Sequence, residues 1–117
     1  MYSIILKFND NSYLARLYKN ESTDEFMREL PLTLNMHELN GNEKYNYLDF
    51  TLPVYSENTE NIESGDIMLY GDNCLVVFYE SFRTSYSYTR LGYIENTQDF
   101  VNALGDGNIT ITIDVKE

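Results

Sequence analysis

Short runs in which apolar and polar residues alternate recur along this chain of 117 residues, and turn signals separate them. The run from Ile109 to Val115 is the clearest, because an apolar residue takes every second position. Alternation with a period of two is the pattern of a β-strand with one buried face. About eight such strands at hairpin spacing predict a mainly β fold, a closed eight-stranded antiparallel barrel, since closure leaves no strand edge exposed.

The strands that we expect differ in how deeply they are buried. Residues 76–79 are nearly continuously apolar, which predicts a strand buried on both faces. The preceding Gly71-Asp72-Asn73 is a hairpin turn signal. The expected strands are residues 2–8, 13–18, 32–37, 47–52, 67–70, 75–79, 85–94 and 109–115.

Two short helices interrupt the strand pattern. Residues 22–25 have the form of a capping box with Ser22 as the N-cap, and Pro31 stops the helix that follows. Asn96 and Thr97 are expected to cap a second helix over residues 98–104. Residues 53–64 between these helices are expected to form a long acidic loop, and loops of this length are often functional.

Charge and composition exclude several classes of function. The net charge is −11 and only eight residues are Lys or Arg, which argues against nucleic-acid and anionic-membrane partners. Cys74 is the single cysteine and His37 the single histidine, so we expect no disulfide and no zinc site. No glycine-rich phosphate loop is present, and we expect no cofactor. Without a signal peptide or an apolar spanning run, the chain is expected to be cytoplasmic.

The segment 85–94 combines a strand pattern with aromatic and charged residues. Alternation places Leu91 and Tyr93 on one face and Tyr88 and Arg90 on the other. Arg90 either binds a carboxylate or carbonyl edge in a groove or pairs with a surface acid. Tyr86 and Tyr88 either line a ligand site or form an ordinary cross-strand aromatic pair.

Several stretches, in order and spacing, resemble the bacterial cyclophilin-like domain family of small β-barrel proteins. The resemblance covers nearly the whole chain and implies an eight-stranded barrel with a helix at each end. Its marks are Leu30-Pro31 after the first helix, Gly65-Asp66-Ile67, the run 75–79, the stretch 88–92 and the late helix before the last strand.

A looser resemblance connects the chain to true cyclophilins, which are prolyl isomerases. Residues 63–67 look like their Gln-Gly-Gly-Asp-Phe stretch, and residues 88–92 look like their His-Val-Val-Phe-Gly stretch. The active-face Gln and His of the enzymes then fall on Glu63 and Tyr88. No Arg lies between Asn40 and Phe82, where the enzymes keep their catalytic Arg, and the chain has no Trp. Efficient isomerisation is therefore not expected.

We interpret residues 1–117 as one cyclophilin-like domain that binds a small molecule or an extended peptide, with no catalytic residue and no metal. One alternative is a weak prolyl isomerase that uses Arg90. Another is a protein-interaction module, and the protein is expected to be a monomer or a homodimer. The residues predicted to line the binding groove are Phe50, Glu63, Phe78, Tyr86, Tyr88 and Arg90.

Overall fold

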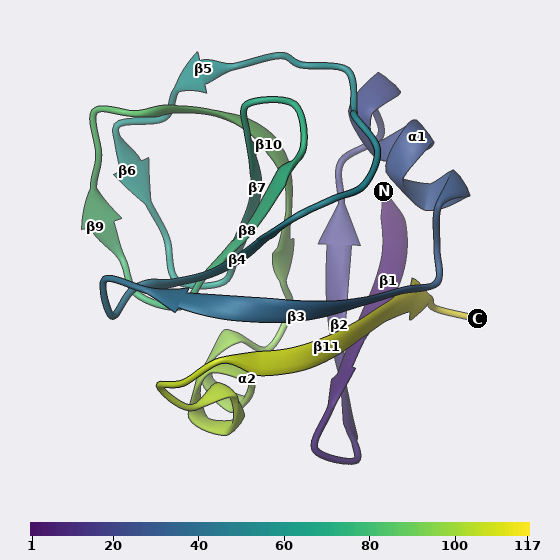
Figure 1. Ribbon diagram of the computed structural model, residues 1–117, viewed down its shortest axis with the longest axis vertical. Coiled ribbons are helices and arrows are strands. Elements are labelled where there is room, and N and C mark those ends of the chain that lie inside the picture. The colour runs from purple at the N-terminus through teal and green to yellow at the C-terminus, as the bar shows by residue number, and fades with distance from the viewer.

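A computed structural model describes residues 1–117 and shows an antiparallel sheet that closes on itself as an eight-stranded barrel (Figure 1). The strands follow one another around the barrel in the order β2-β1-β11-β3-β4-β8-β7-β10, and residues 92–94 of β10 close it by pairing with residues 15–17 of β2. The predicted fold class is confirmed. The barrel strands are β1 (Tyr2–Phe8), β2 (Asn11–Leu17), β3 (Leu32–Leu39), β4 (Glu43–Tyr47), β7 (Asp66–Tyr70), β8 (Cys74–Phe78), β10 (Ser87–Ile94) and β11 (Ile109–Val115).

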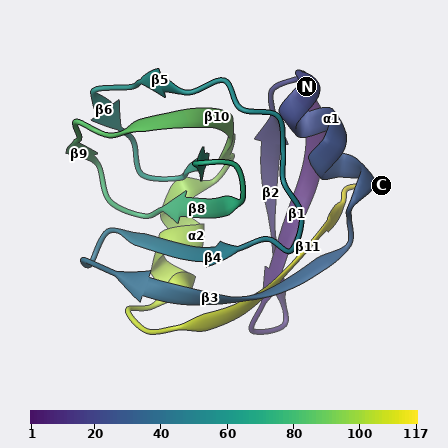
Figure 2. The same ribbon diagram turned by 45° about the horizontal axis from the view of Figure 1, so that its top comes forward.

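Three further strands of two residues each lie outside the barrel. β5 (Glu57–Asn58) pairs with the start of β10. β6 (Asn61–Ile62) and β9 (Phe82–Arg83) form a separate ribbon, which Figure 2 shows beside β8 and β10. The segment 53–64, expected as one long loop, therefore contains two short strands: β5 extends the sheet at β10, and β6 buries Ile62.

The helices are α1 (Glu21–Arg28) and α2 (Thr97–Leu104), which lie on opposite sides of the molecule in Figure 1. The N-cap of α1 is Asn20 and not Ser22. The Asn20 side chain accepts from the Thr23 amide at 2.9 Å, and the Thr23 hydroxyl accepts from the Asn20 amide at 3.0 Å. Ser22 instead donates to the carbonyl of Pro53. Neither helix has the length and apolarity needed to cross a membrane.

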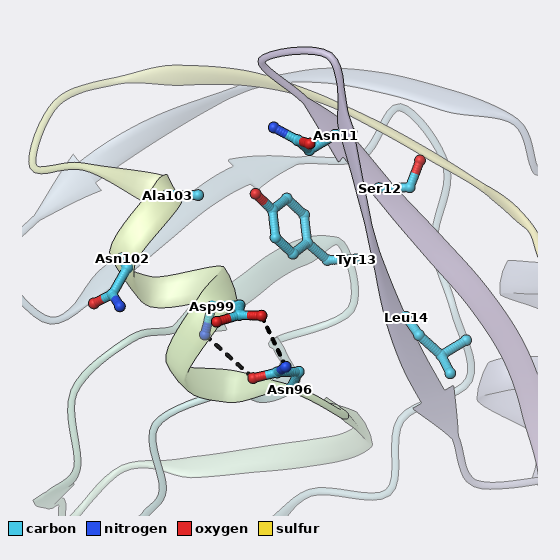
Figure 3. Close-up of a pocket in the computed structure, with 8 residues that line it drawn as sticks. All are labelled: Asn11, Ser12, Tyr13, Leu14, Asn96, Asp99, Asn102 and Ala103. Atoms are coloured by element: carbon cyan, nitrogen blue, oxygen red, sulfur yellow. Dashed lines mark hydrogen bonds between the residues drawn. The ribbon is translucent and has the colours of Figure 1, made fainter.

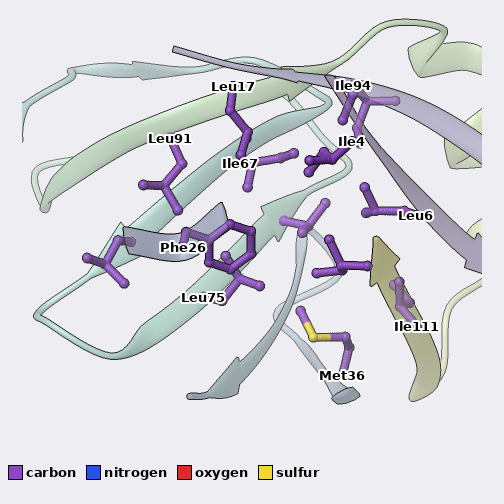
Figure 4. Close-up of a cluster of buried hydrophobic side chains, with 14 of the residues drawn as sticks. Ile4, Leu6, Leu17, Phe26, Met36, Ile67, Leu75, Leu91, Ile94 and Ile111 are labelled. Atoms are coloured by element: carbon purple, nitrogen blue, oxygen red, sulfur yellow. The ribbon is translucent and has the colours of Figure 1, made fainter. Parts of the chain in front are cut away.

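The inside of the barrel holds a cluster of nineteen buried apolar side chains, part of which Figure 4 shows. Leu48 and Leu52 belong to it, as predicted, but the expected strand over residues 47–52 is wrong. The strand runs earlier, over β4, and ends at Tyr47. The amides of Leu48 and Leu52 then donate to the carbonyls of Asn73 and Asp72 in the β7–β8 turn, so this segment alternates inward without belonging to the sheet.

A β-bulge changes which side chains of β10 face the core. Arg90 pairs with Met68 and Gly92 with Ile67, so Leu91 is the extra residue between two consecutive partners. Leu91 and Ile94 consequently both lie in the barrel core. Tyr93 points outward, where its ring centre lies 6.1 Å from that of Tyr18. The expectation that Leu91 and Tyr93 share a face is therefore wrong.

A second cluster of six buried residues lies on the outer face of the same sheet. β8 supplies both clusters, as its apolar run predicted: Leu75 and Val77 pack inside the barrel, while Cys74, Val76 and Phe78 pack outside it. Ile62 of β6 and Phe82 of β9 cover one half of this outer cluster. Elsewhere in this cluster Cys74, Val76 and Tyr88 line a hollow, and this hollow is the candidate site.

Candidate functional site

The candidate site is a hollow of about 310 Å³ on the outer face of the barrel, across β4, β8, β7 and the start of β10. Eight of its ten lining residues are apolar or aromatic, and five of them are tyrosines. We call it the tyrosine groove. It is lined by Leu39, Asn40, Glu43, Tyr45, Tyr47, Tyr70, Cys74, Val76, Tyr86 and Tyr88.

Strand register brings these tyrosines together from distant parts of the chain. Cys74 pairs with Tyr47 on one side and with Tyr70 on the other, and Val76 pairs with Tyr45. Because paired residues point to the same face of a sheet, β8 forms the floor and its neighbours form the two walls. The register of the sheet therefore positions Tyr45, Tyr47 and Tyr70, while Tyr86 lies in the loop that leads into β10.

The walls present aromatic rings at fixed angles. The Tyr70 ring lies 6.0 Å from Tyr86 and 5.6 Å from Tyr88, and the Tyr45 and Tyr47 rings lie 6.1 Å apart on the opposite wall. Tyr47, Tyr70 and Tyr86 are 62%, 47% and 61% exposed, whereas Tyr88 is 4% exposed. Edge-to-face contacts hold such rings in place, so the exposed rings offer rigid apolar area to a ligand.

Glu43 is the only charged residue in the lining. Its side chain is half-buried, and its carboxylate has no hydrogen-bond donor and no ion-pair partner. Burial, and secondarily the charge of Glu38, raises the pKa of this carboxyl above its ordinary value. Because a desolvated carboxylate is unfavourable, Glu43 is the group in the groove that gains most from a partner.

Burial also acts on two other ionisable groups of the lining, Cys74 and Tyr88. Burial, with a smaller contribution from the charge of Glu43, raises the pKa of Cys74 to about 11. The same two causes raise the pKa of Tyr88 to about 12. A thiolate is the nucleophilic form of cysteine, so the raised pKa disfavours that form, and the buried Cys74 forms part of the floor of the groove.

Arg90 does not line the tyrosine groove. Its Nε donates to Glu57 Oε1 at 2.6 Å, which is the surface ion pair that the sequence offered as one of two interpretations. Arg90 shares the outer face with Tyr88, as predicted, since it pairs in register with Met68 of the outer cluster. It nevertheless borders a different hollow of about 460 Å³, together with Tyr18, Asn20, Glu21, Tyr55, Glu57 and Thr89.

The remaining predicted residues are also dispersed. Phe78 is completely buried in the outer cluster beside the groove, with its ring perpendicular to that of Tyr88 at 5.5 Å. Glu63 is exposed on the loop before β7, where it contacts Ser81. Phe50 packs against the core inside the barrel. Of the six predicted residues, Tyr86 and Tyr88 line this groove and the other four lie elsewhere; a binding role for any of the six stays a prediction.

Sequence reasoning missed Glu43, Tyr45, Tyr47 and Tyr70 as lining residues. A signal was present on β4, because residues 43, 45 and 47 alternate with Lys44 and Asn46 and so share one face. Placing the strand at residues 47–52 concealed that alternation. Tyr70 carried no local signal, since only the pairing of β7 with β8 brings it to the groove.

A third hollow, of about 570 Å³, lies between β2 and α2 (Figure 3). Its lining is mostly polar, and Asn96 and Asp99 satisfy each other there as part of the α2 cap. Tyr13 packs against Phe8 and Phe100, with ring centres 4.9 and 5.7 Å away. These side chains have structural partners already, so the tyrosine groove remains the candidate. No group of three or more His, Cys, Asp or Glu residues is placed to hold a metal ion.

Comparisons with known proteins agree with the fold. The solution structure of a hypothetical protein from Archaeoglobus fulgidus superposes with a TM-score of 0.64 over 98% of this chain and 95% of that one. At 14% identity, the likeness concerns the fold alone. A comparison with curated proteins gives no match. The model of the Cyclophilin-like family matches residues 6–114, and the chain therefore belongs to the cyclophilin-like family.

Proposed function

We propose that this protein binds a small, largely apolar molecule in the tyrosine groove and does not catalyse a reaction on it. One observation carries the proposal: five tyrosines surround an apolar floor, and three of them are about half exposed or more. Contiguous exposed aromatic surface is uncommon unless it contacts a ligand or partner. A concave apolar site with a few polar groups is the usual form of a small-molecule site.

The groove favours a small molecule over an extended peptide. Peptides often bind by extending a sheet at a free strand edge. Here β4 lies between β3 and β8, β8 between β4 and β7, and β7 between β8 and β10, so each wall and floor strand already has two neighbours. The hollow of about 310 Å³ also lies at the lower end of the range for small-ligand sites, roughly 300–1,000 Å³.

The alternative of a weak prolyl isomerase has less support. It depends on Arg90 acting on a peptide, but Arg90 borders another hollow and is bonded to Glu57. The lining of the tyrosine groove contains no arginine, lysine or histidine to polarise an amide. We therefore keep the binding proposal as the single one.

Ligand screening by NMR tests the proposal. A library of aromatic fragments is added to the labelled protein, and the expected result is that signals of Tyr70 and Tyr86 shift. Tyr86→Ala should weaken the binding of each hit about tenfold, or about 1.4 kcal/mol, without unfolding the protein, because this side chain is 61% exposed. Tyr18→Ala is the matched control, since Tyr18 is 40% exposed and outside the groove. Hits that bind Tyr86→Ala as well as wild type would refute the proposal.

A further inference from the structure

The tyrosine groove carries negative charge and no positive charge. Glu43 is the only Asp, Glu, Lys or Arg in the lining, and the other nine residues are five tyrosines, Leu39, Asn40, Cys74 and Val76. The pKa values of Cys74 and Tyr88 both respond to the charge of Glu43, so this carboxylate acts directly on the floor of the groove. A ligand in the groove therefore meets negative charge and no positive charge.

The neighbouring lysine cannot neutralise Glu43. Lys44 pairs with Val77, which packs inside the barrel, whereas Glu43 pairs with Phe78, which packs outside. The Lys44 ammonium is completely buried and donates to Glu38 Oε1 at 2.9 Å, to the carbonyl of Gly105 at 3.0 Å and to that of Gly107 at 2.5 Å. Turning it toward the groove would break all three bonds. The carboxylate of Glu43 is thus left without a partner by the fold itself.

The aromatic walls suit a cation as well as an apolar body. The faces of tyrosine rings carry partial negative charge and attract ammonium and guanidinium groups within about 6 Å of the ring centre. Tyr45 and Tyr47 on one wall and Tyr70 and Tyr86 on the other supply such rings. Tyr45 lies two residues from Glu43 on the same face of β4, so ring and carboxylate are neighbours.

We propose that the ligand of the tyrosine groove is an organic cation of small-molecule size, an amine or amidine on an aromatic or apolar body. Its charge pairs with the Glu43 carboxylate, and its body lies between the two tyrosine walls. This inference rests on the proposed function of the groove and adds the charge of the ligand. It also explains why an unpaired, half-buried acid is kept there, since groups that lower stability are retained where they serve binding.

The test uses three probes of one size and three charges: benzylammonium, benzyl alcohol and benzoate. Dissociation constants are measured by NMR titration at pH 7 and low salt. We expect benzylammonium to bind at least fivefold more tightly than benzyl alcohol, and benzoate to bind most weakly. Glu43→Gln should reduce benzylammonium to the affinity of benzyl alcohol and leave benzyl alcohol unchanged. Glu29→Gln removes the same charge from an exposed position at the end of α1 and should change none of the three.

The outcomes separate the two proposals. If benzyl alcohol and benzylammonium bind the groove equally, in wild type and in Glu43→Gln, the ligand is not a cation but the proposed function stands. If no probe of any charge binds the groove, the proposed function fails as well. If the pentapeptide Ala-Ala-Lys-Ala-Ala, with both ends blocked, binds tenfold more tightly than benzylammonium, the partner is a peptide and the small-molecule proposal is overturned.

Discussion

Replacing Gly92 by alanine tests how the barrel closes. Gly92 lies at the bulge of β10, where it pairs with Leu17 of β2. A Cβ atom at this position would stand 2.0 Å from the backbone carbonyl oxygen of Arg16 and 2.8 Å from a methyl group of Leu17. Real Cβ atoms essentially never approach within 3.0 Å of another atom, so the two strands must separate by about 1 Å or more.

The magnitude follows from what this separation breaks. Three residue pairs join β10 to β2, all within two residues of Gly92, and the Tyr18 amide also donates to the carbonyl of Leu91 at 3.0 Å. If each lost hydrogen bond destabilises the fold by about 1 kcal/mol, the closing seam alone loses roughly 3 kcal/mol. Leu17 and Ile94 also pack less well in the core when the seam opens, which adds to this loss.

Urea denaturation followed by circular dichroism measures the effect. We expect Gly92→Ala to lower the free energy of unfolding by about 3 kcal/mol or more. Gly107→Ala is the matched control, because a Cβ atom there meets nothing within 4 Å and the backbone is not in the left-handed region. It should leave stability unchanged or raise it slightly. Equal stabilities for the two variants would refute this account of barrel closure.

Three further predictions concern charge and activity. Burial raises the pKa of Glu43, so its contribution to stability is fully present below the ordinary pKa of a glutamate and is lost as the pH rises through the raised value. Glu43→Gln should therefore increase the melting temperature at pH 7 and have little effect at pH 3. A lower melting temperature at pH 7 would contradict a desolvated carboxylate. Lys44→Met should lower the free energy of unfolding, measured in urea, by about 3 kcal/mol, because Glu38 and the carbonyls of Gly105 and Gly107 lose their donor. A change below about 0.5 kcal/mol would show that this hydrogen-bond network contributes nothing to stability. In a coupled assay on an X-Pro peptide, the protein should not accelerate cis–trans isomerisation, which takes tens of seconds without a catalyst. Acceleration that Arg90→Ala abolishes would restore the isomerase alternative.

The barrel was predictable because its strands alternate locally. The strict alternation of residues 109–115 and the apolar run at β8 each reflect a pattern that lies within seven residues, and the structure confirms both. The cap of α1 was misassigned for a similarly local reason. Two capping-box patterns overlap there, one from Asn20 to Thr23 and one from Ser22 to Glu25. The structure uses the first, while the Ser22 hydroxyl donates to the carbonyl of Pro53.

The errors that affected the site arose from long-range pairing. The bulge at Leu91 shifts the alternation of β10 by one residue, and it lies where β10 begins to pair with β2 as well as with β7. Likewise, Tyr47 and Tyr70 lie on opposite sides of Cys74 because each pairs with it, and the register of β4, β8 and β7 determines this arrangement. Alternation within one strand indicates which residues share a face but not which strands become neighbours, so two of the predicted residues reached the groove and four did not.

A crystal structure of the protein soaked with benzylammonium tests the central claim most directly. We expect the benzyl ring between the walls formed by Tyr45 and Tyr70, over Cys74 and Val76, with the ligand nitrogen within about 4 Å of the Glu43 carboxylate. A ligand bound instead in the hollow beside Arg90, or in the polar hollow between β2 and α2, would contradict the assignment of the tyrosine groove as the binding site.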